Sequence, residues 1–319
     1  MRELAAAAGL LLLGAIGEDV IAQAYPARPV RLVVPWAPGG SVDLLGRLVA
    51  QKLTERGGMS VFVENRAGAG TNLGAEYVAR SAADGYTLLM TSSTQAINVS
   101  LYPKLSYDLV KDFVAISPVA NNTSVLVVHP ALPVKSVKEL VALAKARPGE
   151  LIYASSGSGS TSHLAGELLK MSAGIDLIHV PFKGAGPALT DLLGGHVQMF
   201  ITVIAQTLPH LKAGKLRALA VTSERRLSGM PDLPTMQEAG IGGYEVSVWN
   251  GILAPTGIRQ EVVAFLNSET GQTVKELSGR LAELGTEPLY STPEQFSKFI
   301  RGEIAKWAVV VKRSGARVD

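Results

Sequence analysis

Runs of apolar residues alternate with amphipathic stretches along most of the chain. Val30–Val34 is a mainly β-branched run, which is typical of a strand buried on both faces, and residues 42–53 then place apolar side chains at helical spacing. The same order returns where Leu151–Ala154 precedes a helical pattern that reaches Met171, and again from Leu177–Val180 onward. This alternation predicts an α/β protein with mainly parallel sheets and right-handed crossovers.

Small and hydroxylic residues follow the ends of several predicted strands. Residues 155–163 read Ser-Ser-Gly-Ser-Gly-Ser-Thr-Ser-His, in which Gly157 and Gly159 permit backbone turns that a Cβ would forbid. One of the hydroxyls at residues 160–162 can cap the helix that follows, while other N–H groups of its first turn stay free. Because free N–H groups and the helix dipole favour an anion, this loop and three similar strand ends predict an anion site.

Two interruptions of the apolar pattern divide the chain into lobes. The pair Asn121-Asn122 separates two apolar runs, and residues 231–243 form a Pro- and Gly-rich connection in which we expect one short helix. The predicted division is a first lobe of residues 25–122 and 246–319 and a second lobe of residues 123–245. Two lobes joined by crossing strands make a hinged clamp, and ligands of such sheets bind outside the carboxyl ends of the strands.

The N-terminus has the pattern of an export signal. Arg2 precedes an apolar run over residues 4–16 that is too short to span a bilayer as a helix, and Ala22-Gln23-Ala24 supplies the small residues of a cleavage site. We expect a signal peptide at residues 1–24, cleaved after Ala24, with a retained amphipathic helix as the alternative. Cleavage removes one basic and three acidic residues, so the formal net charge rises from +3 to +5, which is compatible with electrostatic steering of anions.

Composition and spacing limit the chemistry. The chain has no Cys, which excludes disulfides and thiolate sites, and its five His residues lack ligand spacing, so we expect no metal site. No basic run interleaved with aromatic residues points to nucleic acid. Two alternatives stay open. Residues 68–74 resemble a dinucleotide fingerprint, although with the spacing Gly-x-Gly-x-x-x-Gly, and Ser160 and His163 stand three residues apart, as the nucleophile and base of a hydrolase could.

Six segments match a known family in residue type and order. They begin with Val-Pro-Trp-Ala-Pro-Gly-Gly-Ser-Val-Asp and are Val34–Asp43, Asn65–Gly70, Tyr102–Asp108, Ser156–His163, His179–Gly184 and Asp191–Gly195. Together they resemble the Bug family, the extracytoplasmic solute receptors of tripartite tricarboxylate transporters. The resemblance covers almost the whole chain after residue 24.

The resemblance implies a type II periplasmic-binding-protein fold that closes on a small organic carboxylate in the periplasm without a cofactor. The ligand would be a dicarboxylate or tricarboxylate, an amino acid or an aromatic acid, and the partner would be the membrane permease subunits of a tripartite transporter. We expect a monomer that is not an enzyme; a carboxylate sensor or scaffold subunit without a transport role is the alternative.

Such receptors hold carboxylates mostly by backbone N–H groups, hydroxyls and water, which agrees with loops poor in charge. Carried over by position, the implied contacts of the first lobe are Ala37, Gly39, Gly40, Asp43, Gly70, Ser93 and Thr94. Those of the second lobe are Ser156, Gly157, Gly159, Ser160, His163, Lys183, Gly184 and Ala185.

Three positions depart from the family pattern and bear on the choice of acid. Thr71 stands where Gly is more frequent, and Gln95 stands where His or Asn is commoner. The segment Met199-Phe200-Ile201-Thr202 lacks the Asp that often follows this Met-Phe pair in the family.

Overall fold

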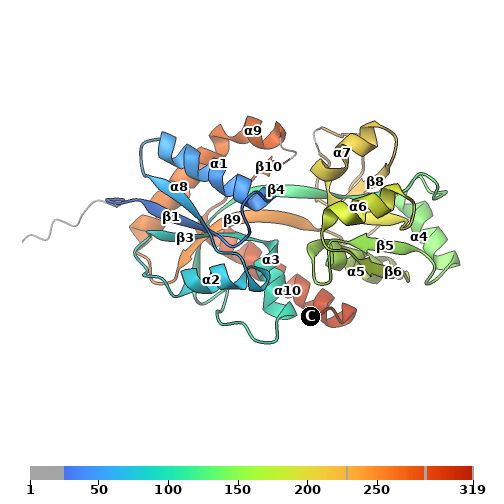
Figure 1. Cartoon of the computed structure of the whole chain (residues 1–319), viewed down its shortest axis with the longest axis horizontal. Coiled ribbons are helices and arrows are strands. Elements are labelled where there is room, and N and C mark those ends of the chain that lie inside the picture. Colours follow the sequence, from blue (N-terminus) through green and yellow to red (C-terminus); the bar gives the residue numbers. More distant parts are fainter. Residues whose placement is uncertain (1–24, 228, 284–285, 318–319) are drawn as a thin grey trace, which may run out of the picture.

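The chain forms two lobes that lie side by side along the long axis of the molecule (Figure 1). The computed structural model describes residues 25–227, 229–283 and 286–317, so the predicted signal peptide at residues 1–24 lies outside the described residues. In each lobe helices pack on a central sheet, as the alternating sequence pattern predicts. Within the described ranges no helix is both long and apolar enough to cross a membrane.

A mixed sheet with the strand order β2-β1-β3-β9-β4 forms the centre of the first lobe. Its strands are β1 (Val30–Val34), β2 (Val61–Asn65), β3 (Thr87–Ser92), β9 (Ser247–Pro255) and the first part of β4 (Phe113–Val128). β1 runs parallel to β2 and β3, whereas β9 runs antiparallel to β3 and β4. The short strand β10 (Glu287–Pro288) also pairs with β4.

The helices of the first lobe follow its strands and return at the C-terminus. They are α1 (Ser41–Glu55), η1 (Ala69–Thr71, a 3₁₀ turn), α2 (Asn72–Ala79), α3 (Ser93–Leu101), α8 (Gln260–Glu276), α9 (Ser278–Glu283) and α10 (Pro293–Ser314). The side chains of Val30, Val33 and Val34 are fully buried, which accounts for the β-branched run in this strand.

The second lobe is built on a sheet with the strand order β4-β7-β5-β6, and β8 also pairs with β4. Its strands are the second part of β4, β5 (Ile152–Ser155), β6 (Ile178–Pro181), β7 (Met199–Val203) and β8 (Arg217–Val221). Its helices are α4 (Val137–Ala146), α5 (Thr161–Ala173), α6 (Ala185–Leu193) and α7 (Ile204–Lys212). β5 is parallel to both β6 and β7, so the carboxyl ends of these three strands meet at one edge of the sheet.

Strand β4 crosses from one sheet into the other. Residues 113–123 pair with β9, whereas residues 124–128 pair with β7 and β8. The polar pair Asn121-Asn122 lies inside this continuous strand, and the Asn122 amide donates to the side-chain oxygen of Asn250 on β9 at 3.2 Å. The change of partner falls beside the predicted boundary, although the lobe limits at 122/123 and 245/246 stay a prediction.

Two elements differ from the sequence prediction. Helix α3 was not expected; Ser92 and Gln95 form a capping box at its start, in which each side chain bonds to the backbone of the other. The short helix expected within residues 231–243 is absent from the described residues of that stretch. Thr235 forms a bridge with Val221 of β8, and the residues from 236 to 240 form hydrogen-bonded turns that do not continue into a helix.

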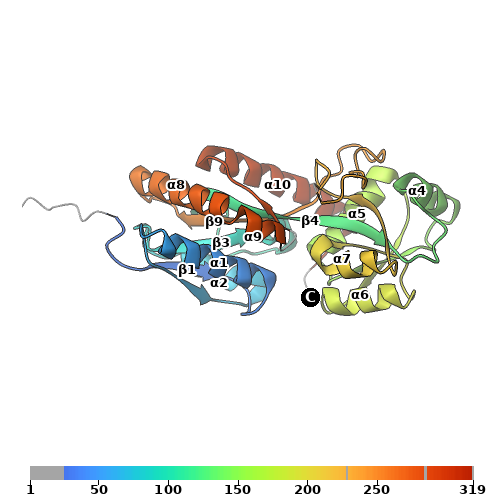
Figure 2. The ribbon, with the colours of Figure 1, turned by 90° about the horizontal axis from the view of Figure 1, so that it is seen from above.

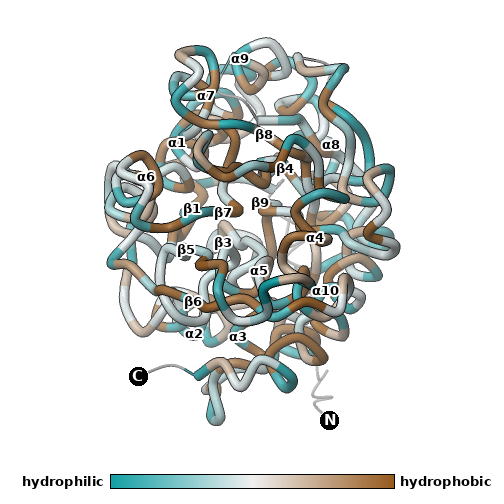
Figure 3. The backbone as a smooth tube through the Cα atoms, turned by 90° about the vertical axis from the view of Figure 1, so that its right-hand side faces the viewer, coloured by the Kyte–Doolittle hydropathy of each residue, from teal (hydrophilic) through white to brown (hydrophobic). Residues whose placement is uncertain are grey.

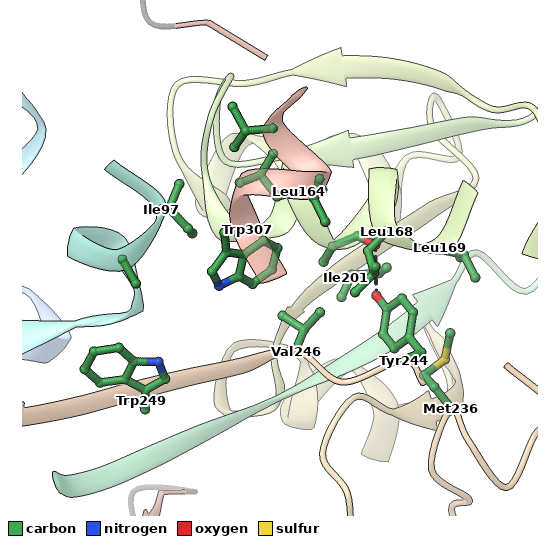
Figure 4. Packing of buried hydrophobic residues seen from close by; sticks show 14 of the residues in the cluster. Ile97, Leu164, Leu168, Leu169, Ile201, Met236, Tyr244, Val246, Trp249 and Trp307 are labelled. Atoms are coloured by element: carbon green, nitrogen blue, oxygen red, sulfur yellow. Dashed lines mark hydrogen bonds between the residues drawn. The ribbon is translucent and has the colours of Figure 1, made fainter. Parts of the chain in front are cut away.

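Helix α10 packs against both lobes (Figure 2). Trp307 of α10 lies between Ile97 of α3 and Leu164 of α5 (Figure 4), so one apolar cluster runs from the first lobe into the second. The carboxylate of Glu303 accepts hydrogen bonds from the indole nitrogens of Trp249 at 3.0 Å and Trp307 at 3.1 Å. Seen from the end of the second lobe, apolar segments gather around β4, β7 and β9, and polar segments lie mostly at the periphery (Figure 3).

Candidate functional site

A cavity of about 310 Å³ lies where elements of both lobes meet. Larger hollows of about 430 and 470 Å³ are lined by residues of the first lobe alone. The side chains that line the cavity are all neutral. They are Thr94, Ser124, Ser156, Ser160, Thr161, Ser162, Ala165, Ala185, Ile201, Thr202, Val203, Gln206, Val246 and Val248.

The loop from β5 to α5 supplies a chain of hydroxyls to this cavity. Ser160 is the N-cap of α5: its Oγ accepts from the backbone N–H of His163 at 3.3 Å and donates to the carbonyl of Gly157 at 2.6 Å. The Oγ of Ser162 lies 3.0 Å from the hydroxyls of both Ser156 and Ser160. The first N–H groups of a helix have no acceptor within the helix. Together with the hydroxyls, they place hydrogen-bond donors at this wall of the cavity, where an anion can accept from them.

His163 does not line the cavity, and its ring instead supports the loop through the backbone of Gly159. Its Nδ1 accepts from the backbone N–H of Gly159 at 3.0 Å, and its ring stacks on His179 with centroids 3.9 Å apart. Burial lowers the pKa of His163, and burial together with His163 lowers the pKa of His179 to about 4, so both rings are neutral. The contact from Ser160 reaches the backbone of His163 and not its ring, which disfavours a nucleophile–base pair.

Glycines shape the second-lobe loops. Gly159 has φ +75°, and a Cβ there would lie 2.5 Å from Leu101, the last residue of α3, so this glycine permits close contact between the lobes. Gly157 has φ +135° and lies beside the lining residue Ser156.

The N-terminus of α6 lies next to that of α5 because β6 and β5 are neighbouring parallel strands. Gly184 is the N-cap of α6, and its N–H donates to the carbonyl of Ser156 at 3.2 Å. Ala185 lines the cavity, whereas the Lys183 side chain is exposed and is not part of the lining.

The loop before α1 lies outside the cavity lining, and Asp43 organises it. Ala37, Gly39 and Gly40 are exposed, while Asp43 is only 2% exposed. The Asp43 carboxylate accepts from Arg47 Nε at 3.0 Å, from Asn65 Nδ2 at 2.7 Å and from the N–H of Gly39 at 2.9 Å. Burial raises the pKa of Asp43, but the hydrogen bonds from these donors outweigh burial and lower the pKa to about 2. The carboxylate therefore stays charged, and its oxygens are already bonded to groups of the protein.

Thr71 and Gln95, two of the departures from the family pattern, bond to each other. Gln95 Nε2 donates to Thr71 Oγ1 at 2.8 Å, and Gln95 Oε1 accepts from the N–H of Ser92 at 2.8 Å. This contact ties the loop that holds Gly70 to the start of α3. Gly70 accepts from Asn98 at 2.8 Å and does not line the cavity.

At the start of α3, Ser93 is fully buried, and Thr94 is the residue that lines the cavity. Four of the implied contacts therefore lie in the cavity wall: Thr94, Ser156, Ser160 and Ala185. No local pattern predicted the wall formed by β4, by β7 and α7, and by the residues at the start of β9. Those residues are Ser124, Ile201, Thr202, Val203, Gln206, Val246 and Val248. Their place depends on strand register, such as the pairing of Ser124 with Val203. Only the segment Met199–Thr202 carried a signal, because it lacks an Asp that is frequent in the family.

Comparison with known proteins supports the sequence resemblance. Residues 45–316 match the family described as tripartite tricarboxylate transporter family receptor. The chain is 40% identical to protein BugT of Bordetella pertussis, over 100% of this chain and 99% of BugT.

Solved structures of similar proteins include two with bound acids. Rpa4515 of R. palustris with adipate is 38% identical, with a TM-score of 0.77 over 92% of this chain and 100% of that one. MatC of Rhodopseudomonas palustris with bound malate is 33% identical, with a TM-score of 0.73 over 90% of this chain and 100% of that one. The two-lobe fold is the one that the resemblance implies, and the chain belongs to the family of tripartite tricarboxylate transporter receptors.

Proposed function

We propose that the protein is a periplasmic receptor that captures a small organic carboxylate between its lobes and delivers it to the permease of a tripartite transporter. The observation that carries this proposal is the neutral, hydroxyl-lined cavity at the N-terminus of α5, to which both lobes contribute. The adipate and malate bound to the similar structures support the same class of ligand. Export with cleavage after Ala24, a monomeric state and the absence of enzymatic activity belong to the same proposal.

A carboxylate in this cavity would be held by dipoles. The hydroxyls of Ser156 and Ser162 and the first N–H groups of α5 and α6 are donors, and the helix dipoles favour the negative charge. Ser160 donates to the carbonyl of Gly157 and so holds the loop that presents these donors. A ligand that also contacts Thr94 binds the closed form more tightly than the open one and shifts the population toward it. Asp43, Gly70, Gly159 and His163 would act by holding their loops.

The test is ligand binding to the chain from residue 25 onward, after unfolding and refolding to remove any carried-over acid. In a thermal-shift screen of mono-, di- and tricarboxylates, a ligand at 100 times its Kd stabilises the folded state by about 2.7 kcal/mol, which is easily detected. No shift with any acid in the panel would refute the carboxylate assignment.

Two serines of the same loop provide a matched pair. Ser162 lines the cavity and accepts from the N–H of Ser156 at 2.9 Å, whereas Ser158 is exposed and is not part of the lining. Ser162→Ala should weaken the binding of the acid found in the screen by about tenfold, and Ser158→Ala should leave it unchanged. Equal effects of both variants would place the site elsewhere.

A further inference from the structure

The wall of the cavity formed by β7 and α7 carries a polar pair, Thr202 and Gln206. Thr202 is almost fully buried near the end of β7, and Gln206 lies in the first turn of α7 with an exposed side chain. Helices α7 and α5 lie apart, toward the upper and lower sides of the second lobe in Figure 1. The pair therefore belongs to a different side of the cavity wall from the α5 hydroxyls.

The hydrogen bond within the pair leaves donors available. Thr202 Oγ1 donates to Gln206 Oε1 at 3.0 Å, so the carbonyl oxygen of the amide is occupied and its NH₂ group remains to donate. These donors lie at the N-terminus of a nine-residue helix, where the dipole favours negative charge. Among the described residues that line the cavity, none carries a carboxylate that could balance a positive charge on a ligand.

Apolar side chains complete the cavity wall. The side chains of Ile201, Val203, Val246 and Val248 are purely aliphatic, and Ala165 of α5 adds another apolar residue to the lining. An apolar chain packs there without leaving polar atoms unpaired, whereas a hydroxyl-rich chain would lose hydrogen bonds to water.

We propose that Gln206 is a specificity-determining residue whose NH₂ group binds an acceptor oxygen at the second end of the ligand, and that Thr202 orients this amide through the hydrogen bond to its oxygen. This inference rests on the proposed function. The receptor then selects acids in which an apolar chain separates the carboxylate from a second oxygen-bearing group, and it rejects ligands that carry an apolar or ammonium group at that end.

The test compares acids of equal length by isothermal titration calorimetry on the refolded chain from residue 25 onward. Adipate, hexanoate and 6-aminohexanoate share the carbon number of the acid in the Rpa4515 structure and differ in the second end group. Succinate, butyrate and 4-aminobutyrate give the same comparison for a shorter chain. In the series whose chain length fits the cavity, we expect the diacid to bind at least about tenfold more tightly than the monoacid. The amino-acid ligand should bind most weakly.

Two variants assign this preference to the pair. Gln206→Met removes the donors and should lower the affinity for the diacid to that for the monoacid. Gln206→Glu keeps the shape of the side chain and adds a negative charge. It should lower the affinity for the diacid by at least about tenfold and leave the affinity for the monoacid nearly unchanged. The affinity for the amino-acid ligand should rise. Gln272→Glu on α8 makes the same charge change on an exposed helix position outside the cavity and should alter none of the affinities.

The outcomes separate this inference from the function on which it rests. The wild type could bind monoacid and diacid with equal affinity, or Gln206→Glu could lower both affinities equally. In either case the proposed function as an acid receptor is retained, and the role assigned to Thr202 and Gln206 is wrong. If neither series nor any acid of the thermal-shift panel binds, both the receptor assignment and the pair are overturned.

Discussion

Replacement of Glu303 by Ala should destabilise the protein by about 4 kcal/mol. Glu303 Oε2 is the acceptor for the indole N–H groups of Trp249 and Trp307, and both tryptophans are fully buried. A buried donor left without an acceptor costs about 1–3 kcal/mol, so two of them account for most of the effect. Lys306, which pairs with Glu303, adds little because about a fifth of its side chain is exposed and its ammonium group can turn to water.

The matched control is Glu303→Gln, whose amide oxygen can still accept from both indoles. Glu303→Gln should lower the free energy of unfolding by about 1 kcal/mol, because the two hydrogen bonds from the indoles lose their charged acceptor. Urea unfolding followed by far-UV circular dichroism gives both values by linear extrapolation, provided that the denaturant dependence is unchanged. If Glu303→Ala costs less than about 1 kcal/mol, or if Glu303→Gln is as damaging as Glu303→Ala, the indole bonds do not hold α10 in place.

Two further predictions concern the loop before α5. His163 and His179 have lowered pKa values in the folded state, His179 to about 4, against about 6.5 when unfolded. The contribution of the two neutral rings to the free energy of unfolding is therefore complete above about pH 6.5 and is lost as the pH falls toward 4. The urea midpoint should fall over this range. The fall should be smaller in His179→Phe, because that side chain cannot be protonated. A pH profile that is equally steep in this variant would contradict the assignment. Ser160→Ala and Ser136→Ala both remove an N-cap, of α5 and α4, and should each cost about 1 kcal/mol of stability. Calorimetry should show weaker acid binding only for Ser160→Ala, and equal affinities in the two variants would mean that Ser160 is a cap and nothing more.

The sequence predicted most elements of the fold because their apolar patterns are strong and local. Val30–Val34 forms a strand with the expected bounds, and the strands expected at Leu151–Ala154 and Leu177–Val180 form within one residue of them. Helix α3 was missed although Ser92 and Gln95 stand at capping-box spacing, because the hydroxyl-rich strand end was interpreted as a ligand loop only. The helix expected after residue 231 fails because a tertiary bridge from Thr235 to β8 outweighs local propensity.

The candidate site was predictable only where a local pattern marks it. Ser156 and Ser160 stand beside glycines and before a helix, which indicates both a cap and a donor site from sequence alone. Val246 and Val248 belong to an ordinary alternating stretch and carry no mark of a site. They reach the cavity through long-range pairing, because the N–H of Val246 donates to the carbonyl of Thr222 and Val248 pairs with Asn122 of β4. His163 shows the reverse case: its motif position implies a ligand contact, whereas its ring supports Gly159 and stacks on His179.

The position of β9 within the sheet sets the order in which the chain can fold. β9 begins only at Ser247, yet it lies between β3 and β4, so the first lobe lacks its central strand until most of the chain is available. The second sheet needs nothing beyond residue 221 for its strand pairing and can form earlier. Such long-range pairing slows folding, because a large loop must close before the contacts stabilise it. In the export that we propose for this chain, the delay would favour translocation, because the first lobe cannot complete its sheet until Ser247 and the residues that follow it have been made.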